Sequence, residues 1–283
     1  MITLPVLLAA LLLVGDEPDV KAEMIPTTGL ITPGGTTLLA VHLELEPGWH
    51  VYWENPGDSG IATTLQVKGP KGFVVGPVLY PVPKRIDQPG GLVCYGYEDT
   101  ACLFVEVTAP KTLKGNEFLF TAEVQWLVCD DVCFSGEAKL SAKLRRRRGV
   151  GLPAPDKRLT PHLKRLPQPL STWPGATVRI EGSVTEPVMV VTLPPRTPPH
   201  PESKNEEAPK ATFFPEVFPG LKITQIEVKD HGPKIELRVS CTFTPLENHP
   251  VPTLRGVLLV TTQDKEQISL SLEPRWPPKV EDT

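Results

Sequence analysis

The sequence lacks a strong net charge, a composition that favours long helices and any apolar run long enough to span a bilayer comfortably. The formal net charge of the 283 residues is -4, so the chain as a whole has no general electrostatic attraction to nucleic acid. Its 34 prolines and 22 glycines argue against long helices and favour many short strands joined by turns. With 40% hydrophobic and 22% charged residues, the chain can still form a packed core.

An apolar run covers residues 2–14, and the acidic segment 16–19 follows it at once. The run is too short to span a bilayer comfortably, so we interpret residues 1–15 as a secretory signal peptide. No Lys or Arg precedes the run and no Ala-x-Ala cleavage site follows it, which leaves an uncleaved anchor as the alternative. We expect the rest of the chain to lie in the periplasm or elsewhere outside the cytoplasm, where disulfides persist.

The remaining sequence predicts an all-β protein with two immunoglobulin-like β-sandwich domains. Short runs of alternating apolar residues predict strands in both halves of the chain. Proline-rich residues 149–174 predict a linker with one short helix around residues 156–166. We therefore expect one domain over residues 16–148 and another over residues 175–283, the second with a disordered insertion near residues 194–210.

A strand rich in aromatic residues is predicted at residues 49–53, and an Asn-Pro-Gly-Asp turn ends it. Trp49 and Trp53 are predicted to be core residues of a sandwich. His50 alternates out of phase with both tryptophans, so we expect it on the opposite face of the strand, as a structural histidine. The residues of this motif are Trp49, His50, Tyr52, Trp53, Asn55, Pro56, Gly57 and Asp58.

Cys129 and Cys133 are separated only by Asp130-Asp131-Val132. In one regular strand their Cα atoms would be roughly 13 Å apart, whereas a disulfide requires about 4.4–6.8 Å, so a bond between them requires a bend. The aspartates tolerate turn conformations, and both flanks, residues 118–128 and 137–144, have strand patterns. This predicts a hairpin with the two cysteines facing each other at its end.

The two aspartates also bear on the chemistry of this pair. Negative charge beside a thiol disfavours the thiolate, and a dithiol that gains nothing from thiolate stabilisation is the better electron donor. This predicts a reducing pair. A tight turn closed by a purely structural disulfide has the same sequence, and the spacing alone favours that structural role.

Five cysteines leave at least one unpaired. Cys94 lies within residues 90–99, which we expect to form a loop with two tyrosines. Cys102 could face Cys94 across this loop, but the loop is long for such a disulfide. Cys241 is alone in the second half of the chain and lies in the middle of a predicted strand, which favours a buried free thiol.

Four motifs follow one another over about a hundred residues. They are Gly-Trp-His-x-Tyr-Trp-x-Asn-Pro-Gly-Asp-Ser-Gly at residues 48–60, Tyr80-Pro81-x-Pro83 with Lys84-Arg85, Tyr95-Gly96-Tyr97 and Val128-Cys129-x-x-x-Cys133. Together they resemble the amino-terminal periplasmic region of the DsbD family, in particular the branch of ScsB-like suppressors of copper sensitivity. Phe213-Phe214-Pro215 and residues 254–258 give a looser resemblance in the second half.

The resemblance implies an immunoglobulin-like domain with a redox-active pair, which falls here on Cys129 and Cys133. In the family, this pair takes electrons from a thioredoxin-like domain that a membrane domain supplies. It then passes them by thiol–disulfide exchange to oxidised periplasmic proteins. The chain to Thr283 contains neither donor domain, so the resemblance implies a thioredoxin-like or membrane-embedded thiol reductase supplied as a separate protein.

The resemblance also implies a cap loop over the disulfide, which falls at Cys94, Tyr95 and Gly96. Tyr95 is then the expected shield, and Cys94 replaces an expected aromatic residue. In the best-known member the cysteines are further apart, and acidic residues precede the cap where this chain has Leu92 and Val93. The candidates for proton transfer in their place are Asp130, Asp131 and Glu98.

We therefore favour an extracytoplasmic thiol–disulfide exchange module, a component of a protein-disulfide reductase, with oxidised client proteins as partners and no cofactor. One alternative is a secreted scaffold or binding protein whose Cys129–Cys133 bond is only structural. Another is a copper-binding module, because thiolates select Cu(I) and His50 or Cys94 could complete a site.

Overall fold

The computed structural model describes residues 17–149, 151, 153–195, 210–216, 218–231, 234–247, 254–262 and 265–273. The expected signal peptide lies outside these described residues. Residues 196–209, which make up most of the expected insertion, also lie outside them. The described part of the chain contains no helix with the length and apolar composition needed to span a bilayer.

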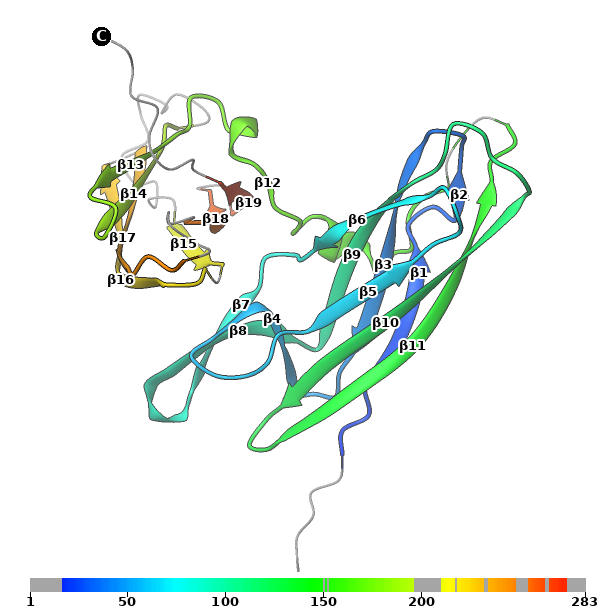
Figure 1. Ribbon diagram of the computed structural model, residues 1–283. Coiled ribbons are helices and arrows are strands. Elements are labelled where there is room, and N and C mark those ends of the chain that lie inside the picture. The colour runs from blue at the N-terminus through cyan, green and yellow to red at the C-terminus, as the bar shows by residue number, and fades with distance from the viewer. Residues whose placement is uncertain are drawn as a thin grey trace, which may run out of the picture.

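The described residues form two β-sandwiches of two sheets each, which confirms the predicted all-β, immunoglobulin-like fold (Figure 1). The smaller sheet of the first sandwich has the order β1 (Lys21–Pro26), β3 (Thr36–Glu44), β9 (Thr100–Thr108), β6 (Val74–Leu79). Its larger sheet has the order β2 (Leu30–Ile31), β11 (Cys133–Arg146), β10 (Glu117–Cys129), β4 (His50–Gly57), β8 (Leu92–Glu98), β7 (Lys84–Gln88), with β5 (Thr64–Lys68) also paired to β10.

The second sandwich follows a short helix, α1 (Thr160–Leu163), in the stretch where the sequence predicted one. One sheet has the order β12 (Gln168–Pro169), β19 (Gln267–Leu272), β18 (Gly256–Thr261), β15 (Lys210–Pro215). The other has the order β13 (Thr177–Gly182), β14 (Pro187–Leu193), β17 (Lys234–Phe243), β16 (Leu221–His231). Although β12 falls inside the stretch that we expected to be linker, it extends the second sandwich by parallel pairing with β19.

The core of the first sandwich follows from the alternation of β10, in which every second residue from Phe118 to Val128 is buried. Trp53 of β4 is fully buried in the same core, as predicted. Trp49 is only partly buried and packs against Phe134, with ring centroids 5.9 Å apart. Because this face of the larger sheet is used for the core, the alternate residues of β4 and β10 lie on its outer face.

Residues 90–99 do not form the expected loop. Most of them belong to β8, which pairs with β7 on one side and with β4 on the other. The turn is confined to the 3-10 segment η1 (Pro89–Gly91), where Gly90 and Gly91 have φ angles of 82° and 78° that glycine adopts without steric cost. The strand pattern was hidden because Gly96 interrupts it; a Cβ at this position would strike the carbonyl oxygen of Val51.

The second sandwich contacts the first through β15. The ring of Phe214 lies 6.3 Å from Trp53 and 5.4 Å from Tyr95, and it belongs to the core cluster of the first sandwich. The side-chain amide of Asn55 donates a hydrogen bond to the carbonyl of Pro215 at 2.7 Å. Contacts with the second sandwich therefore hold strands β4 and β8 of the first sandwich in place.

We expect Phe214→Ala to destabilise the protein by about 3–5 kcal/mol, the usual cost of truncating a buried phenylalanine. Its neighbour Phe213 packs into the core of the second sandwich instead. Urea unfolding followed by tryptophan fluorescence measures the loss, with Phe213→Ala as the matched control for the second sandwich alone. If Phe214→Ala leaves the urea midpoint of the first sandwich unchanged, Phe214 does not stabilise the core of that sandwich.

Glu54 lies next to this contact, and burial together with the nearby Glu216 raises the pKa of its carboxyl to about 7. Burial also raises the pKa of Glu216. Because a carboxyl with a raised pKa binds more protons in the folded than in the unfolded state, its stabilising contribution is lost as pH rises through its folded pKa. The Glu54 carboxyl therefore lowers the unfolding temperature at pH 8 relative to pH 5, whereas the lowered pKa values of His42, His50 and His162 shift it in the opposite direction.

Relative to the natural protein, we expect Glu54→Gln to raise the unfolding temperature more at pH 8 than at pH 5, and Glu123→Gln, at an exposed position of β10, to show no such difference between the two pH values. Thermal unfolding followed by circular dichroism at both pH values provides the measurement. The same pH dependence in Glu54→Gln as in the natural protein would show that Glu54 does not cause it.

Candidate redox site

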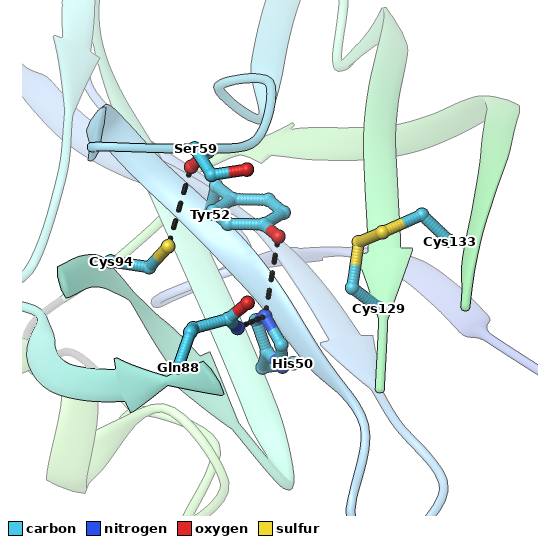
Figure 2. The surroundings of a disulfide bond; sticks show 7 residues. All are labelled: His50, Tyr52, Ser59, Gln88, Cys94, Cys129 and Cys133. Carbon is cyan, nitrogen blue, oxygen red and sulfur yellow. Dashed lines mark hydrogen bonds between the residues drawn. A yellow bond between two sulfur atoms is a disulfide. The ribbon is translucent and has the colours of Figure 1, made fainter. Parts of the chain in front are cut away.

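Cys129 and Cys133 are directly opposite residues at the end of the β10–β11 hairpin. Their sulfur atoms form a disulfide, and their Cα atoms are 4.2 Å apart (Figure 2). The residues between them form the turn, with Asp130 and Asp131 both exposed. The prediction of facing cysteines at a hairpin end is confirmed.

The two halves of this disulfide differ in exposure. Cys129 is 1% exposed, because it ends β10 inside the sheet, next to β4. Cys133 is exposed, because it begins β11, whose pairing on its other side is with β2 at Arg145 and Arg146. A thiolate arriving from solvent therefore reaches the sulfur of Cys133 first.

Tyr52 is the aromatic residue beside the disulfide. It forms one buried cluster with Cys94 and Cys129, and Ile86 and Leu127 pack against that cluster. All five side chains lie on the outer face of the larger sheet, the face opposite the core. Figure 2 shows the Tyr52 ring between Cys94 and the cysteine pair.

Tyr95, the expected shield, does not join this cluster. Adjacent residues in a strand point to opposite faces of the sheet, so Cys94 faces the cysteine pair and Tyr95 faces the core, where its ring is 6.4 Å from Trp53. The expected cap assignment is wrong for Tyr95, and Tyr52 takes that place. The sequence did contain a pattern that indicates this placement, because His50 and Tyr52 alternate with Trp49 and Trp53 and so point away from the core.

The turn after β4 covers Tyr52 from outside. Gly60 lies so close to the Tyr52 ring that any Cβ there would overlap it. The carbonyl of Ser59 accepts a hydrogen bond from the Cys94 thiol at 3.4 Å (Figure 2). Residues 57–60, rather than residues 94–96, therefore cover the aromatic side of the site.

The remaining residues of the aromatic motif hold this turn in place. The side-chain oxygen of Asn55 accepts a hydrogen bond from the Gly57 amide at 3.0 Å, across Pro56. Gly57 has a φ of 87°, which lets the backbone approach Val93 closely. The carboxylate of Asp58 accepts a hydrogen bond from the Val93 amide at 2.9 Å. These residues shape the backbone around the site and do not reach the sulfur atoms.

His50 is 5% exposed and lies in β4, opposite Cys129 of β10 and opposite Glu98 of β8. Its Nε2 is 3.3 Å from the Tyr52 hydroxyl and 3.1 Å from the side-chain nitrogen of Gln88. Burial lowers the pKa of His50, and nearby carboxylates offset part of this effect. The imidazole is therefore mainly neutral at pH 7.

The three acidic residues expected to transfer protons are all exposed. Asp130 and Asp131 lie in the turn itself, and Glu98 forms an ion pair with Lys84 at 2.8 Å. Carboxylates in such surroundings stay in contact with water. None of the three is buried, whereas His50 is buried and directly opposite Cys129 in the sheet.

Cys94, Cys102 and Cys241 are free, buried thiols. The disulfide between Cys94 and Cys102 is absent, and the prediction of a buried free thiol at Cys241 is confirmed. Burial raises the pKa of all three thiols, to about 11 for Cys241. Within the described ranges, no three His, Cys, Asp or Glu side chains are grouped so that they could hold a metal ion.

Residues 21–145 match the family described as "Thiol:disulfide interchange protein DsbD, N-terminal". The first sandwich is a DsbD-type N-terminal domain. This confirms the resemblance that the four motifs indicated, over the part of the chain that carries the cysteine pair.

One solved structure extends the comparison of the fold beyond the DsbD-type domain. The N-terminal periplasmic domain of ScsB from Proteus mirabilis is similar in fold, with a TM-score of 0.55 and 15% identity over 92% of this chain and 94% of that chain. The N-terminal domain of DsbD from Neisseria meningitidis, in the reduced form, shares 12% identity over 48% of this chain and 90% of that chain, with a TM-score of 0.28. No curated protein sequence gave a match.

In the reduced protein we expect iodoacetamide to modify Cys133 first, because the thiolate is the reactive species and Cys133 is the exposed cysteine. Cys94, Cys102 and Cys241 should stay unmodified until the protein is unfolded in urea, because they are buried and their pKa values are raised. Peptide mass spectrometry after timed quenching measures the order. Modification of Cys94 as fast as Cys133 in the folded protein contradicts the geometry of the site.

Proposed function

We propose that the DsbD-type domain relays reducing equivalents outside the cytoplasm, from a thioredoxin-like or membrane-embedded thiol reductase to oxidised client proteins. The observation that carries this proposal is the asymmetric disulfide, in which an exposed cysteine is bonded to a buried one at an open hairpin end. An inert structural bond has no need of an accessible sulfur. The family to which residues 21–145 belong supports the same chemistry.

The domain is loaded in two exchange steps. A donor thiolate attacks the sulfur of Cys133, the bond to Cys129 breaks, and the Cys129 sulfur leaves as a thiolate and takes up a proton. The second donor thiol then loses its proton and attacks its own partner sulfur in the mixed disulfide, which leaves the donor oxidised and releases Cys133 as a thiolate that takes up the second proton. Two electrons and two protons have entered the domain.

Delivery to a client runs through Cys133 as well. The Cys133 thiolate attacks the client disulfide and releases one client thiolate, which leaves a mixed disulfide. The thiol of Cys129 then loses its proton and its sulfur attacks Cys133, so the second client thiolate leaves and the Cys129–Cys133 bond forms again. The client gains the two electrons that the domain loses.

The surface next to the disulfide supports docking of a partner protein. A cavity of about 420 Å³ lies along the hairpin, with Ile61, Leu127 and Ser135 among its lining residues. Ile61 is 64% exposed, and Val132, at the tip of the turn, is 53% exposed. Apolar side chains this exposed beside a reactive bond favour transient contact with an apolar rim on a thioredoxin-like donor or a client.

Expression outside the cytoplasm provides the test. We expect Cys129→Ser to accumulate mixed disulfides through Cys133, because the sulfur that would resolve them is missing. Cys133→Ser should accumulate far fewer, because its remaining sulfur is buried. Non-reducing electrophoresis followed by mass spectrometry identifies the trapped proteins, and Cys94→Ser is the control for a buried thiol outside the pair.

A second measurement separates relay from structural disulfide. The relay requires a reduction potential above about -300 mV, the range below which structural disulfides resist reduction. A lower value, no trapped protein in either variant and a loss of about 2–4 kcal/mol in Cys129→Ala would together assign the bond a structural role.

A further inference from the structure

Four side chains form a row across the outer face of the larger sheet. Glu98 of β8 is opposite His50 of β4, His50 is opposite Cys129 of β10, and Cys129 is opposite Cys133 of β11. Directly opposite residues on neighbouring antiparallel strands have Cβ atoms about 4.5–5.5 Å apart and point to the same face. His50 is therefore the cross-strand neighbour of Cys129, the buried half of the redox pair.

The buried sulfur needs a proton acceptor. Cys129 is 1% exposed, and burial in apolar surroundings disfavours the thiolate that must form before it attacks Cys133. Water reaches this thiol poorly. A neutral base inside the site would remove the obstacle without exposing the sulfur.

The hydrogen bonds around His50 show that Nε2 is an acceptor in the neutral ring. The Gln88 side-chain amide donates to Nε2 at 3.1 Å, so this nitrogen carries no hydrogen in the neutral ring. The Tyr52 hydroxyl is 3.3 Å from the same nitrogen and can donate to it. Tyr52 also packs in the buried cluster that contains Cys129. Figure 2 shows the hydroxyl at the end of the ring that is directed to His50.

We propose that Tyr52 and His50 form a proton relay that deprotonates Cys129 in the step that releases the client. The relay presupposes the exchange function proposed above and adds the groups that move its proton. As the Cys129 thiol ionises, its proton passes to the Tyr52 oxygen while the Tyr52 proton passes to Nε2 of His50. The Cys129 sulfur then bonds to Cys133, the bond between Cys133 and the client breaks, and the client leaves as a thiolate. The imidazolium returns its proton to that thiolate or to water.

The groups that face His50 define how this step depends on pH. They are Glu98 from β8, with its ion-paired Lys84, Asp130 from the turn, Tyr52 from its own strand, Cys129 from β10 and the uncharged Gln88 from β7. Burial lowers the pKa of His50, and Glu98 and Asp130 counteract it. His50 is thus able to accept a proton at pH 7, and the rate of release should level off above the pKa of His50.

A single-turnover reaction with 5,5′-dithiobis(2-nitrobenzoate) tests the relay. One equivalent of this aromatic disulfide gives a first coloured thiolate when Cys133 attacks it and a second when Cys129 displaces the remaining half. In His50→Gln we expect the second phase to slow by at least about ten-fold at pH 7 and the first phase to change by less than about two-fold. The second phase of the variant should also keep rising with pH up to about pH 9, following ionisation of a thiol.

Two further variants keep the test decisive. Tyr52→Phe preserves the packing of the ring and should slow the same phase, so it serves if His50→Gln proves unstable. His42→Gln replaces a buried histidine of the other sheet and should move neither phase. An unchanged second phase in both His50→Gln and Tyr52→Phe, or equal slowing of both phases, overturns the relay.

The outcomes separate the relay from the proposed function. If the second phase depends on His50 but Cys129→Ser traps no partner, the relay stands and the exchange with other proteins fails. If partners are trapped but the second phase ignores His50 and Tyr52, the exchange stands and the relay fails.

Discussion

The cross-strand register of Cys129 and Cys133 is the constraint from which the chemistry of this molecule follows. A three-residue turn closes the β10–β11 hairpin so that the two cysteines are directly opposite each other. One of them ends a strand inside the sheet, and the other begins a strand near its edge. The same pairing that forms the disulfide therefore makes its sulfur atoms unequal, with Cys129 protected and Cys133 accessible.

The two faces of the larger sheet carry separate tasks. The inner face holds the core, including Trp53 and Tyr95, and Phe214 of the second sandwich packs against both. The outer faces of the same strands carry Tyr52 and Cys94 beside the disulfide. Because one strand contributes to both faces, contact with the second sandwich also restrains the backbone on which the redox site is built.

The site departs from the cap arrangement that the DsbD resemblance implied. Tyr52, covered by the turn at residues 57–60, lies beside the disulfide, and Cys94 lies next to it as a buried thiol. The raised pKa of the Cys94 thiol disfavours its participation in exchange. The exposed carboxylates near the turn remain in water, whereas the buried residues His50 and Tyr52 are, respectively, opposite Cys129 in the sheet and packed in its cluster.

The sequence by itself determined the features that depend on near neighbours. Alternating apolar residues predicted most strands and the all-β class. The short spacing between Cys129 and Cys133 predicted the hairpin. The position of Cys241 in the middle of a strand, far from any other cysteine, predicted its buried thiol. Only the tertiary structure decided that Cys129 is the buried half of the pair, that Tyr95 faces the core and that His50 lies beside Cys129. Those placements depend on the register between β4, β8 and β10, strands far apart in the sequence. A shift of one residue would move every side chain to the other face, and the register is set by the packing of the whole core.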